Sequence, residues 1–175
     1  MATTTELIKE LREATGAGVM DCKRALTESA NDLEKARELL RRWGMEGAAK
    51  KVGRETNEGT VASYIHSNNG VGRVGALVEV NCETDFVART DQFKHLAHRI
   101  AQHIVAAGPE YVSDEDVPTD LDAETREQVV RDRVLLTQRF QATNQTVNDM
   151  LKEAVGTLGE NIQVSRFSRF VLGGK

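Results

Sequence analysis

Residues 74–89 read Val-Gly-Ala-Leu-Val-Glu-Val-Asn-Cys-Glu-Thr-Asp-Phe-Val-Ala-Arg. Apolar residues occupy every second position from Val74 to Cys82, which predicts a strand with one buried face. The following segment turns a corner before a periodic helix and places the ring of Phe86 beside the carboxylate of Asp85. A ring at such a corner either packs in the protein's own core or is held out for a partner. The pattern by itself leaves both possibilities open.

Two further stretches complete a predicted antiparallel sheet around this strand. Residues 60–66 are rich in β-branched and aromatic side chains, and residues 67–70 (Ser-Asn-Asn-Gly) have the composition of a turn, so we expect a hairpin. Residues 161–171 alternate again and predict a closing strand. With the helical patterns between them, these strands indicate an α+β fold, a small antiparallel sheet packed with helices.

The hairpin region also contains a Gly-x-Gly-x-x-Gly pattern at residues 70–75. In dinucleotide-binding proteins these glycines open a helix, whose N-terminus meets the pyrophosphate. A strand follows here instead. We therefore interpret the glycines as a loose hairpin turn and expect no nucleotide cofactor.

A strongly periodic helix follows the corner. Its apolar positions are Phe93, Leu96, Ala97, Ile100, Ile104 and Ala107. His95 and His98 fall on its polar side, and His103 falls at the edge of the apolar stripe. The three histidines do not converge on one face, and no cysteine or carboxylate set completes a site. We expect surface histidines and no bound metal.

The first fifty residues predict three short helices. The oxygens of Thr3 to Thr5 can cap the first helix, and Gly16 fits the left-handed position that ends it. One face of the second helix carries, at helical spacing, Val19, Cys22, Leu26 and Ser29. Met20 lies about 100° round from Val19. It is therefore either a residue at the rim of the core or an adaptable apolar contact for a partner.

The third helix is expected to begin with Asn31 as its N-cap and Glu34 three residues later. Three helices in about fifty residues form a marginal core, which is typical of a binding module. Residues 47–57 then predict a basic helix tail followed by a linker. We divide the chain near Gly53 into a three-helix domain (1–53) and an α+β domain (54–175).

The composition excludes several classes of protein. Of the 175 residues, 29% are charged, and the formal net charge is -4, so neither a disordered nor a collagen-like chain is expected. No apolar run approaches the roughly 20 residues of a membrane helix, and the first residues lack the features of a signal peptide. We expect a cytoplasmic protein without membrane contact, with Cys22 and Cys82 as free buried thiols.

The charge distribution argues against a nucleic-acid partner. Residues 108–132 hold nine acidic groups against Arg126 and Arg131, and no strongly basic surface is evident. Residues 166–170 (Arg-Phe-Ser-Arg-Phe) contain two arginines and two phenylalanines, which leaves stacking on single-stranded RNA as one alternative, although core aromatics beside solvated arginines are commoner. No nucleophile with a base, carboxylate pair or metal set is recognisable, which favours a binding protein over an enzyme. A generic peptide-binding module is a further alternative.

Four segments resemble signatures of one known family. Residues 11–26 (Leu-Arg-Glu-Ala-Thr-Gly-Ala-Gly-Val-Met-Asp-Cys-Lys-Arg-Ala-Leu) are similar to the amino-terminal signature of bacterial translation elongation factor Ts. Residues 79–89 are similar to its second signature, and residues 64–66 (Tyr-Ile-His) and 159–162 (Gly-Glu-Asn-Ile) fit the same family. The length is similar to that of the short form, which lacks the coiled-coil insertion and the second half of the core.

This resemblance implies a fold and an activity. The fold is a ubiquitin-associated-like three-helix domain followed by an α+β core. The activity is guanine-nucleotide exchange: the protein binds elongation factor Tu–GDP and promotes GDP release during translation elongation, without covalent chemistry or a cofactor of its own. Short members of the family pair as homodimers through their sheets, and the resemblance implies the same here.

The resemblance also implies roles for individual residues. A finger near the magnesium site of Tu would comprise Thr84, Asp85, Phe86 and Val87. A helix of the nucleotide-binding domain of Tu would be contacted by Arg12, Val19 and Met20. His66 would reach a more distal domain of Tu. Where the family usually has Met-Met, this chain has Val19-Met20, and valine keeps the apolar character but has less reach.

Overall fold

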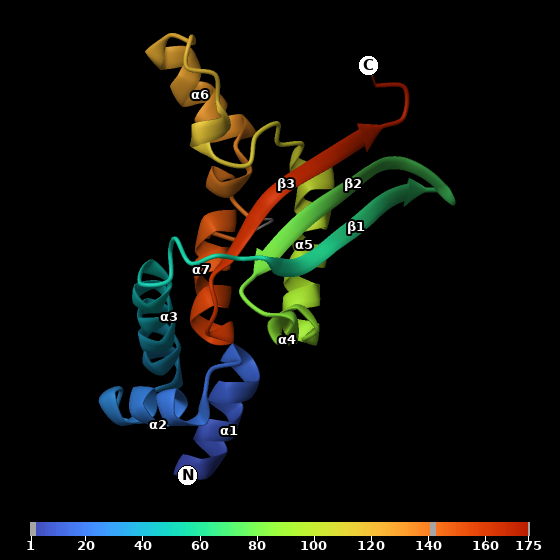
Figure 1. Ribbon diagram of the computed structural model, residues 1–175. Helices are drawn as coiled ribbons and strands as arrows, with labels where there is room; N and C mark the ends of the chain where they lie inside the picture. Colours follow the sequence, from blue (N-terminus) through green and yellow to red (C-terminus); the bar gives the residue numbers. More distant parts are fainter. Residues whose placement is uncertain (1–2, 141–142, 175) are drawn as a thin grey trace.

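The computed structural model describes residues 3–140 and 143–174 (Figure 1). Three helices open the chain: α1 (Thr4–Thr15), α2 (Val19–Glu28) and α3 (Leu33–Ala49). Thr3 caps α1 in a capping box with Glu6, and Gly16 ends it at φ 69°, which confirms the predicted start and end of this helix.

The predicted N-cap of the third helix was wrong by one residue. Asn31 has a left-handed backbone with φ 66°, whereas an N-cap needs an extended backbone. Asp32 has that backbone, and its side chain accepts a hydrogen bond from the amide of Lys35 at 3.1 Å. Asparagine tolerates the left-handed region well, so Asn31 serves the tight reversal between α2 and α3 instead.

The three helices enclose a small core of their own. Its buried members are Leu11, Cys22, Ala25, Leu26 and Ala36. Val19 shares the predicted face with Cys22 but is 49% exposed, because it is the first residue of α2 and lies at the edge of this small core. Trp43 packs against the core and carries the guanidinium of Arg24 on its ring at 4.2 Å.

Among the described residues, three strands form one antiparallel sheet in the order β1 (Glu58–Asn68), β2 (Val71–Cys82) and β3 (Ile162–Val171). The predicted alternation is confirmed: the inner positions of β2 from Ala76 to Cys82 are buried. The sheet packs against α5 (Asp91–Ala107), which lies behind it in Figure 1, and against α7 (Val147–Leu158), which lies beside the start of β3. This α+β arrangement is the predicted fold class.

The interpretation of the hairpin glycines as a loose turn was wrong. The turn is a tight two-residue reversal at Asn69 and Gly70, both with positive φ (50° and 78°). Gly72 and Gly75 lie within β2 instead. A Cβ on Gly72 would approach Cγ2 of Ile65 to 2.9 Å, so the absence of a side chain there makes room for Ile65 on the outer face of the hairpin.

His103 is not a surface residue, contrary to the expectation for all three helix histidines. It is only 3% exposed, and its Nε2 lies 3.1 Å from Oε1 of Gln138. The segment from Leu135 to Phe140 folds over the edge of the apolar stripe and covers it, with the Phe140 ring 5.4 Å from the imidazole. This burial lowers the pKa of His103.

The remaining elements connect the sheet to its helices. Helix α4 (Asp85–Ala88) follows β2 directly, and two short 3-10 turns (Asp114–Asp116 and Leu135–Thr137) flank α6 (Ala123–Arg133). Helix α6 lies away from the sheet at the upper end of the molecule (Figure 1). No helix in the described part of the chain is long and apolar enough to cross a membrane.

The three-helix region is packed against the larger core through α3. Ala48, near the end of α3, is 4% exposed and belongs to the same core cluster as the sheet and α5, and α3 lies alongside α7. The chain then continues through Gly53, at φ 85°, into β1. The division at residue 53 stays a prediction, because packing contacts between the two regions are extensive.

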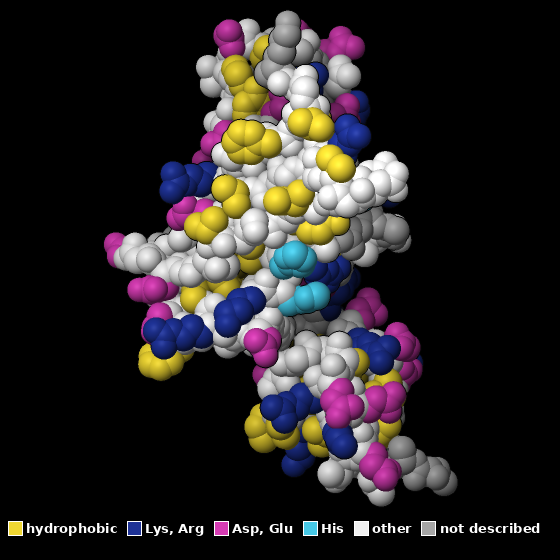
Figure 2. Space-filling view, turned by 90° about the vertical axis from the view of Figure 1, so that its right-hand side faces the viewer, with side chains coloured by type: hydrophobic (Ala, Val, Ile, Leu, Met, Phe, Trp, Pro, Cys, Tyr) yellow, Lys and Arg dark blue, Asp and Glu magenta, His cyan; other side chains and the backbone are white. Residues whose placement is uncertain are grey.

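The outer face of the sheet carries exposed apolar side chains. Val61, Ile65, Leu77 and Phe170 are all largely exposed. The expectation that both closing-strand phenylalanines are core residues was therefore half wrong: Phe167 packs against the core, but Phe170 is 71% exposed. Figure 2 views the molecule from the side on which the tip of the β1–β2 hairpin lies. On this side, hydrophobic side chains are exposed in the upper half, and charged side chains are more frequent in the lower part, near α1 to α3.

Candidate functional site

The residues between β2 and the end of α4 form a short finger, defined as Thr84–Val87. Thr84 has an extended backbone, and its Oγ1 accepts a hydrogen bond from the amide of Val87 at 3.4 Å, so it caps the single turn of α4. The carboxylate of Asp85 occupies the first helical position, where negative charge is favourable. The sequence thus specifies a helical turn immediately after a strand.

The finger directs its two apolar side chains in different directions. Val87 packs against the core and the neighbouring Ala88 is buried, whereas Phe86 is 79% exposed. Val87 and Ala88 thus fix the turn to the core of the protein. The ring of Phe86 is therefore exposed to solvent and does not pack in the protein's own core. This decides between the two possibilities that the sequence left open.

Asp85 is held by a neighbour on the same turn. Its Oδ2 lies 2.9 Å from Nη2 of Arg89, four residues later. Both side chains are substantially exposed, so this pair adds little to stability. Its effect is to orient the carboxylate next to the exposed ring.

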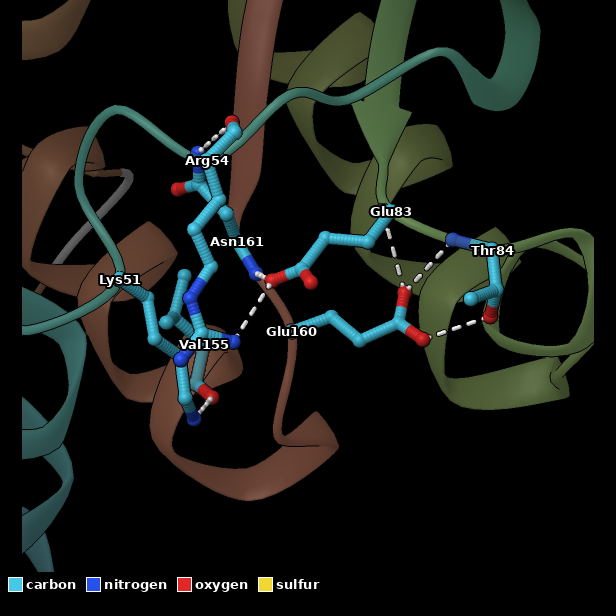
Figure 3. A network of polar contacts seen from close by, with 7 residues as sticks. All are labelled: Lys51, Arg54, Glu83, Thr84, Val155, Glu160 and Asn161. Atoms are coloured by element: carbon cyan, nitrogen blue, oxygen red, sulfur yellow. Dashed lines mark hydrogen bonds and ion pairs between the residues drawn. The ribbon is translucent and has the colours of Figure 1, made fainter.

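Polar contacts behind the finger form a network that the sequence did not reveal (Figure 3). The carboxylate of Glu160, from the connection between α7 and β3, accepts hydrogen bonds from the amides of Glu83 and Thr84 and from the Thr84 hydroxyl. Nothing in the spacing of residues 83 and 160 predicts this contact. Antiparallel pairing of the second and closing strands was the available signal, because it places the end of one strand beside the start of the other.

Arg12, Val19 and Met20 are exposed on α1 and α2, with Met20 73% exposed. Met20 is therefore not a rim residue of the small core. The link between these helices lies beside the first turn of α5, since a Cβ on Gly16 would come within 2.9 Å of Nε2 of Gln92. In Figure 1, α1, α2 and α4 accordingly occupy the same, lower end of the molecule.

His66 lies apart from these residues. It is exposed in β1 and pairs with Val74, eight residues before the end of β2, which corresponds to about 26 Å along the strand. The Tyr64 hydroxyl lies 3.5 Å from its Nδ1, and the Tyr64 ring packs edge-on against His98. The structure thus places Arg12, Val19 and Met20 at the same end of the molecule as the finger, with His66 toward the other end.

The described residues offer little for covalent chemistry. Cys22 and Cys82 are free and buried, as predicted, and burial raises the pKa of both thiols, so both are protonated at neutral pH. Within the described ranges, His, Cys, Asp and Glu side chains form no group of three or more that could hold a metal ion. What the finger can do is insert an aromatic ring, flanked by an oriented carboxylate, into a complementary pocket.

Comparison with known proteins identifies the family. The family model for elongation factor TS matches residues 6–139 and also residues 83–175. The chain belongs to the elongation factor Ts family. This confirms the resemblance found on the signature segments.

Individual relatives match over nearly the whole chain. Elongation factor Ts of Fervidobacterium nodosum is 46% identical over 199 residues, which covers 99% of this chain and 100% of that protein. Elongation factor Ts of Carboxydothermus hydrogenoformans is 48% identical over 196 residues, covering 97% of this chain and 89% of the relative. That of Anaeromyxobacter sp. strain K is 45% identical, covering 97% and 88%.

Proposed function

We propose that this elongation factor Ts family member is a guanine-nucleotide exchange factor that binds elongation factor Tu–GDP in the cytoplasm and promotes GDP release. The observation that carries the proposal is the exposed ring of Phe86 on a capped, core-anchored turn. Aromatic anchors of this kind dominate the energy of many interfaces. The family membership supplies the identity of the partner.

The proposed mechanism is thermodynamic coupling between two ligands of Tu. The factor binds a state of Tu whose nucleotide and magnesium sites are distorted. It therefore weakens GDP binding, and bound GDP weakens its own binding by the same factor. The protein makes and breaks no covalent bond and uses no cofactor or metal of its own.

In this proposal the finger acts as a wedge near the magnesium site of Tu. Phe86 enters between two helices of the nucleotide-binding domain, and Asp85 hydrogen-bonds at the mouth of that pocket. Thr84 and Val87 hold the wedge at its base, since one caps the turn and the other packs against the core.

The other predicted contacts extend the interface in two directions. Arg12, Val19 and Met20 bind a second helix of the same domain, which agrees with their exposure at the finger end of the molecule. His66 reaches a more distal domain of Tu, which agrees with its place along β1 away from the finger. Neither a nucleic acid nor a membrane takes part.

We further propose that two copies pair through the outer faces of their sheets. Ile65 in β1 and Phe170 in β3 both lie opposite Gly75 of β2, so these two apolar side chains flank a position without a side chain on that face. Exposed apolar side chains in register across a sheet are typical of a surface that another protein covers. A homodimer of this kind would present two fingers to Tu.

The decisive experiment measures release of a fluorescent GDP analogue from Tu as this protein is added. A concentration-dependent acceleration that saturates is expected, and gel filtration with and without Tu gives the stoichiometry of the complex. Unchanged release, together with the absence of a complex on gel filtration, would overturn the proposal.

A further inference from the structure

Glu160 makes an unusually complete set of contacts to the backbone that leads into the finger. Its Oε2 accepts hydrogen bonds from the amides of Glu83 at 3.1 Å and Thr84 at 3.0 Å, and its Oε1 accepts one from Oγ1 of Thr84 at 2.6 Å (Figure 3). Hydrogen bonds to an ionised carboxylate are stronger than those between neutral groups. Both residues that precede α4 are thus held by one side chain from a distant part of the sequence.

The hydrogen bond from the Thr84 hydroxyl to Glu160 determines whether this hydroxyl donates or accepts in the helix cap. A hydroxyl has one proton to donate and lone pairs to accept with. Because the proton is directed to Glu160, a lone pair of Oγ1 remains for the amide of Val87. The carboxylate therefore sets the hydrogen-bonding direction of the residue that caps the finger.

A second carboxylate makes the reciprocal contact. Oε1 of Glu83 accepts hydrogen bonds from the amide of Asn161 at 2.6 Å and from Nη1 of Arg54 at 3.4 Å. The side-chain amide of Asn161 in turn donates to the carbonyl of Arg54 at 2.9 Å. The connection after β2 and the connection before β3 hold each other, since Cys82 and Ile162 pair directly in the sheet.

We propose that Glu160 is a positioning residue for the finger: it fixes the first turn of α4 so that the ring of Phe86 is presented ready to bind. This inference rests on the proposed exchange function. A segment ordered before binding loses less conformational entropy in the complex, which raises affinity without any new contact. Glu160 need not touch Tu for this effect.

The test is a double-mutant cycle with E160Q and F86A, read as fluorescent GDP release from Tu. E160Q keeps the size of the side chain but loses the charge and one acceptor. We expect about a tenfold loss of exchange in the wild-type background and little further loss in the F86A background. Equal losses in the two backgrounds, or no loss in either, would overturn the proposal. E110Q is the matched control, because Glu110 forms an exposed ion pair with Arg133, the last residue of α6, and it should exchange like the wild type.

A second measurement does not depend on Tu. Amide hydrogen exchange of Thr84 should be accelerated in E160Q, while that of Ile100, in the buried part of α5, should be unchanged. Unaltered protection of Thr84 would refute the positioning role even if the proposed exchange function failed. Should E160Q not fold, E160D, which keeps the charge but shortens the side chain by one methylene group, undergoes the same cycle with F86A and is expected to give the same non-additive result.

Discussion

Gly44 of α3 and Gly156 of α7 meet where the two helices touch, and the contact is not symmetric. A Cβ added to Gly156 would overlap the backbone of Gly44, with the carbonyl carbon only 2.9 Å away. A Cβ added to Gly44 would lie 3.6 Å from the Cα of Gly156, which is an ordinary contact. The three-helix region is therefore held against the core by a helix pair that needs glycine on one side only.

This asymmetry predicts opposite effects for two alanine substitutions. Gly156→Ala should lower the free energy of unfolding by about 1–3 kcal/mol, because the helices have to separate to admit the methyl group. Gly44→Ala should be neutral or should stabilise by up to about 1 kcal/mol, because alanine favours the helix. Urea unfolding of both variants measures the difference, and equal destabilisation by the two would contradict the asymmetric contact.

Phe86→Ala should fold normally and lose most of the exchange activity. The side chain is exposed, so its removal costs little stability, whereas an interface anchor is worth roughly 2 kcal/mol or more, about 30-fold in affinity. Fluorescent GDP release from Tu measures the loss, with circular dichroism as the control for folding. Wild-type release by a folded variant would rule out the wedge.

The Met20 side chain offers a matched comparison with another exposed apolar residue. Met20→Ala should weaken Tu binding while the melting temperature stays nearly unchanged, because the side chain is 73% exposed. Val52→Ala, in the exposed linker after α3, should change neither quantity. Isothermal titration with Tu and thermal melting of both variants provide the readout. A large loss of stability in the Met20 variant would assign the residue to the core instead.

Much of the fold follows from local patterns. The alternation that ends at Cys82, the apolar stripe that begins at Phe93 and the left-handed glycine at Gly16 all specify conformations that depend on near neighbours in sequence. These elements were predicted correctly. Asn31 shows the limit of such reasoning, because Asn31 and Asp32 can both cap a helix and only the backbone of the preceding turn decides between them.

The misjudged residues depend on contacts that are distant in sequence. His103 is buried because Gln138 and Phe140 fold back over it. Glu160 holds the finger only because the connection before β3 meets the connection after β2 in the folded protein. Helical spacing places a histidine at the edge of a stripe but does not say what covers that edge. The corner with Phe86 beside Asp85 was singled out because its chemistry is local, and the family resemblance implied that it forms a finger. The network that holds the finger was not predicted.

The proposed homodimer predicts a change of oligomeric state. Phe170→Ser removes the most exposed aromatic side chain on the outer face of the sheet, so it should weaken self-association. Sedimentation velocity at several concentrations measures this, with Val52→Ser as an exposed apolar control outside the sheet. A wild-type chain that sediments as a monomer at every concentration would refute pairing through the sheet.

His103 predicts a pH dependence of stability. Burial lowers its pKa in the folded protein below the ordinary value of about 6.5 that it has in the unfolded chain. As the pH falls below about 7, the unfolded chain gains a proton that the folded protein does not bind, so the free energy of unfolding decreases. One such proton contributes a slope of at most about 1.4 kcal/mol per pH unit, and the slope ends once the pH falls below the pKa in the folded state. Urea unfolding between pH 5 and pH 8, at a fixed protein concentration, should show this decrease in the wild type and a flatter dependence in His103→Gln. His95→Gln, which alters an exposed residue of the same helix, should keep the wild-type slope. A slope that survives in His103→Gln would show that other groups cause the acid sensitivity.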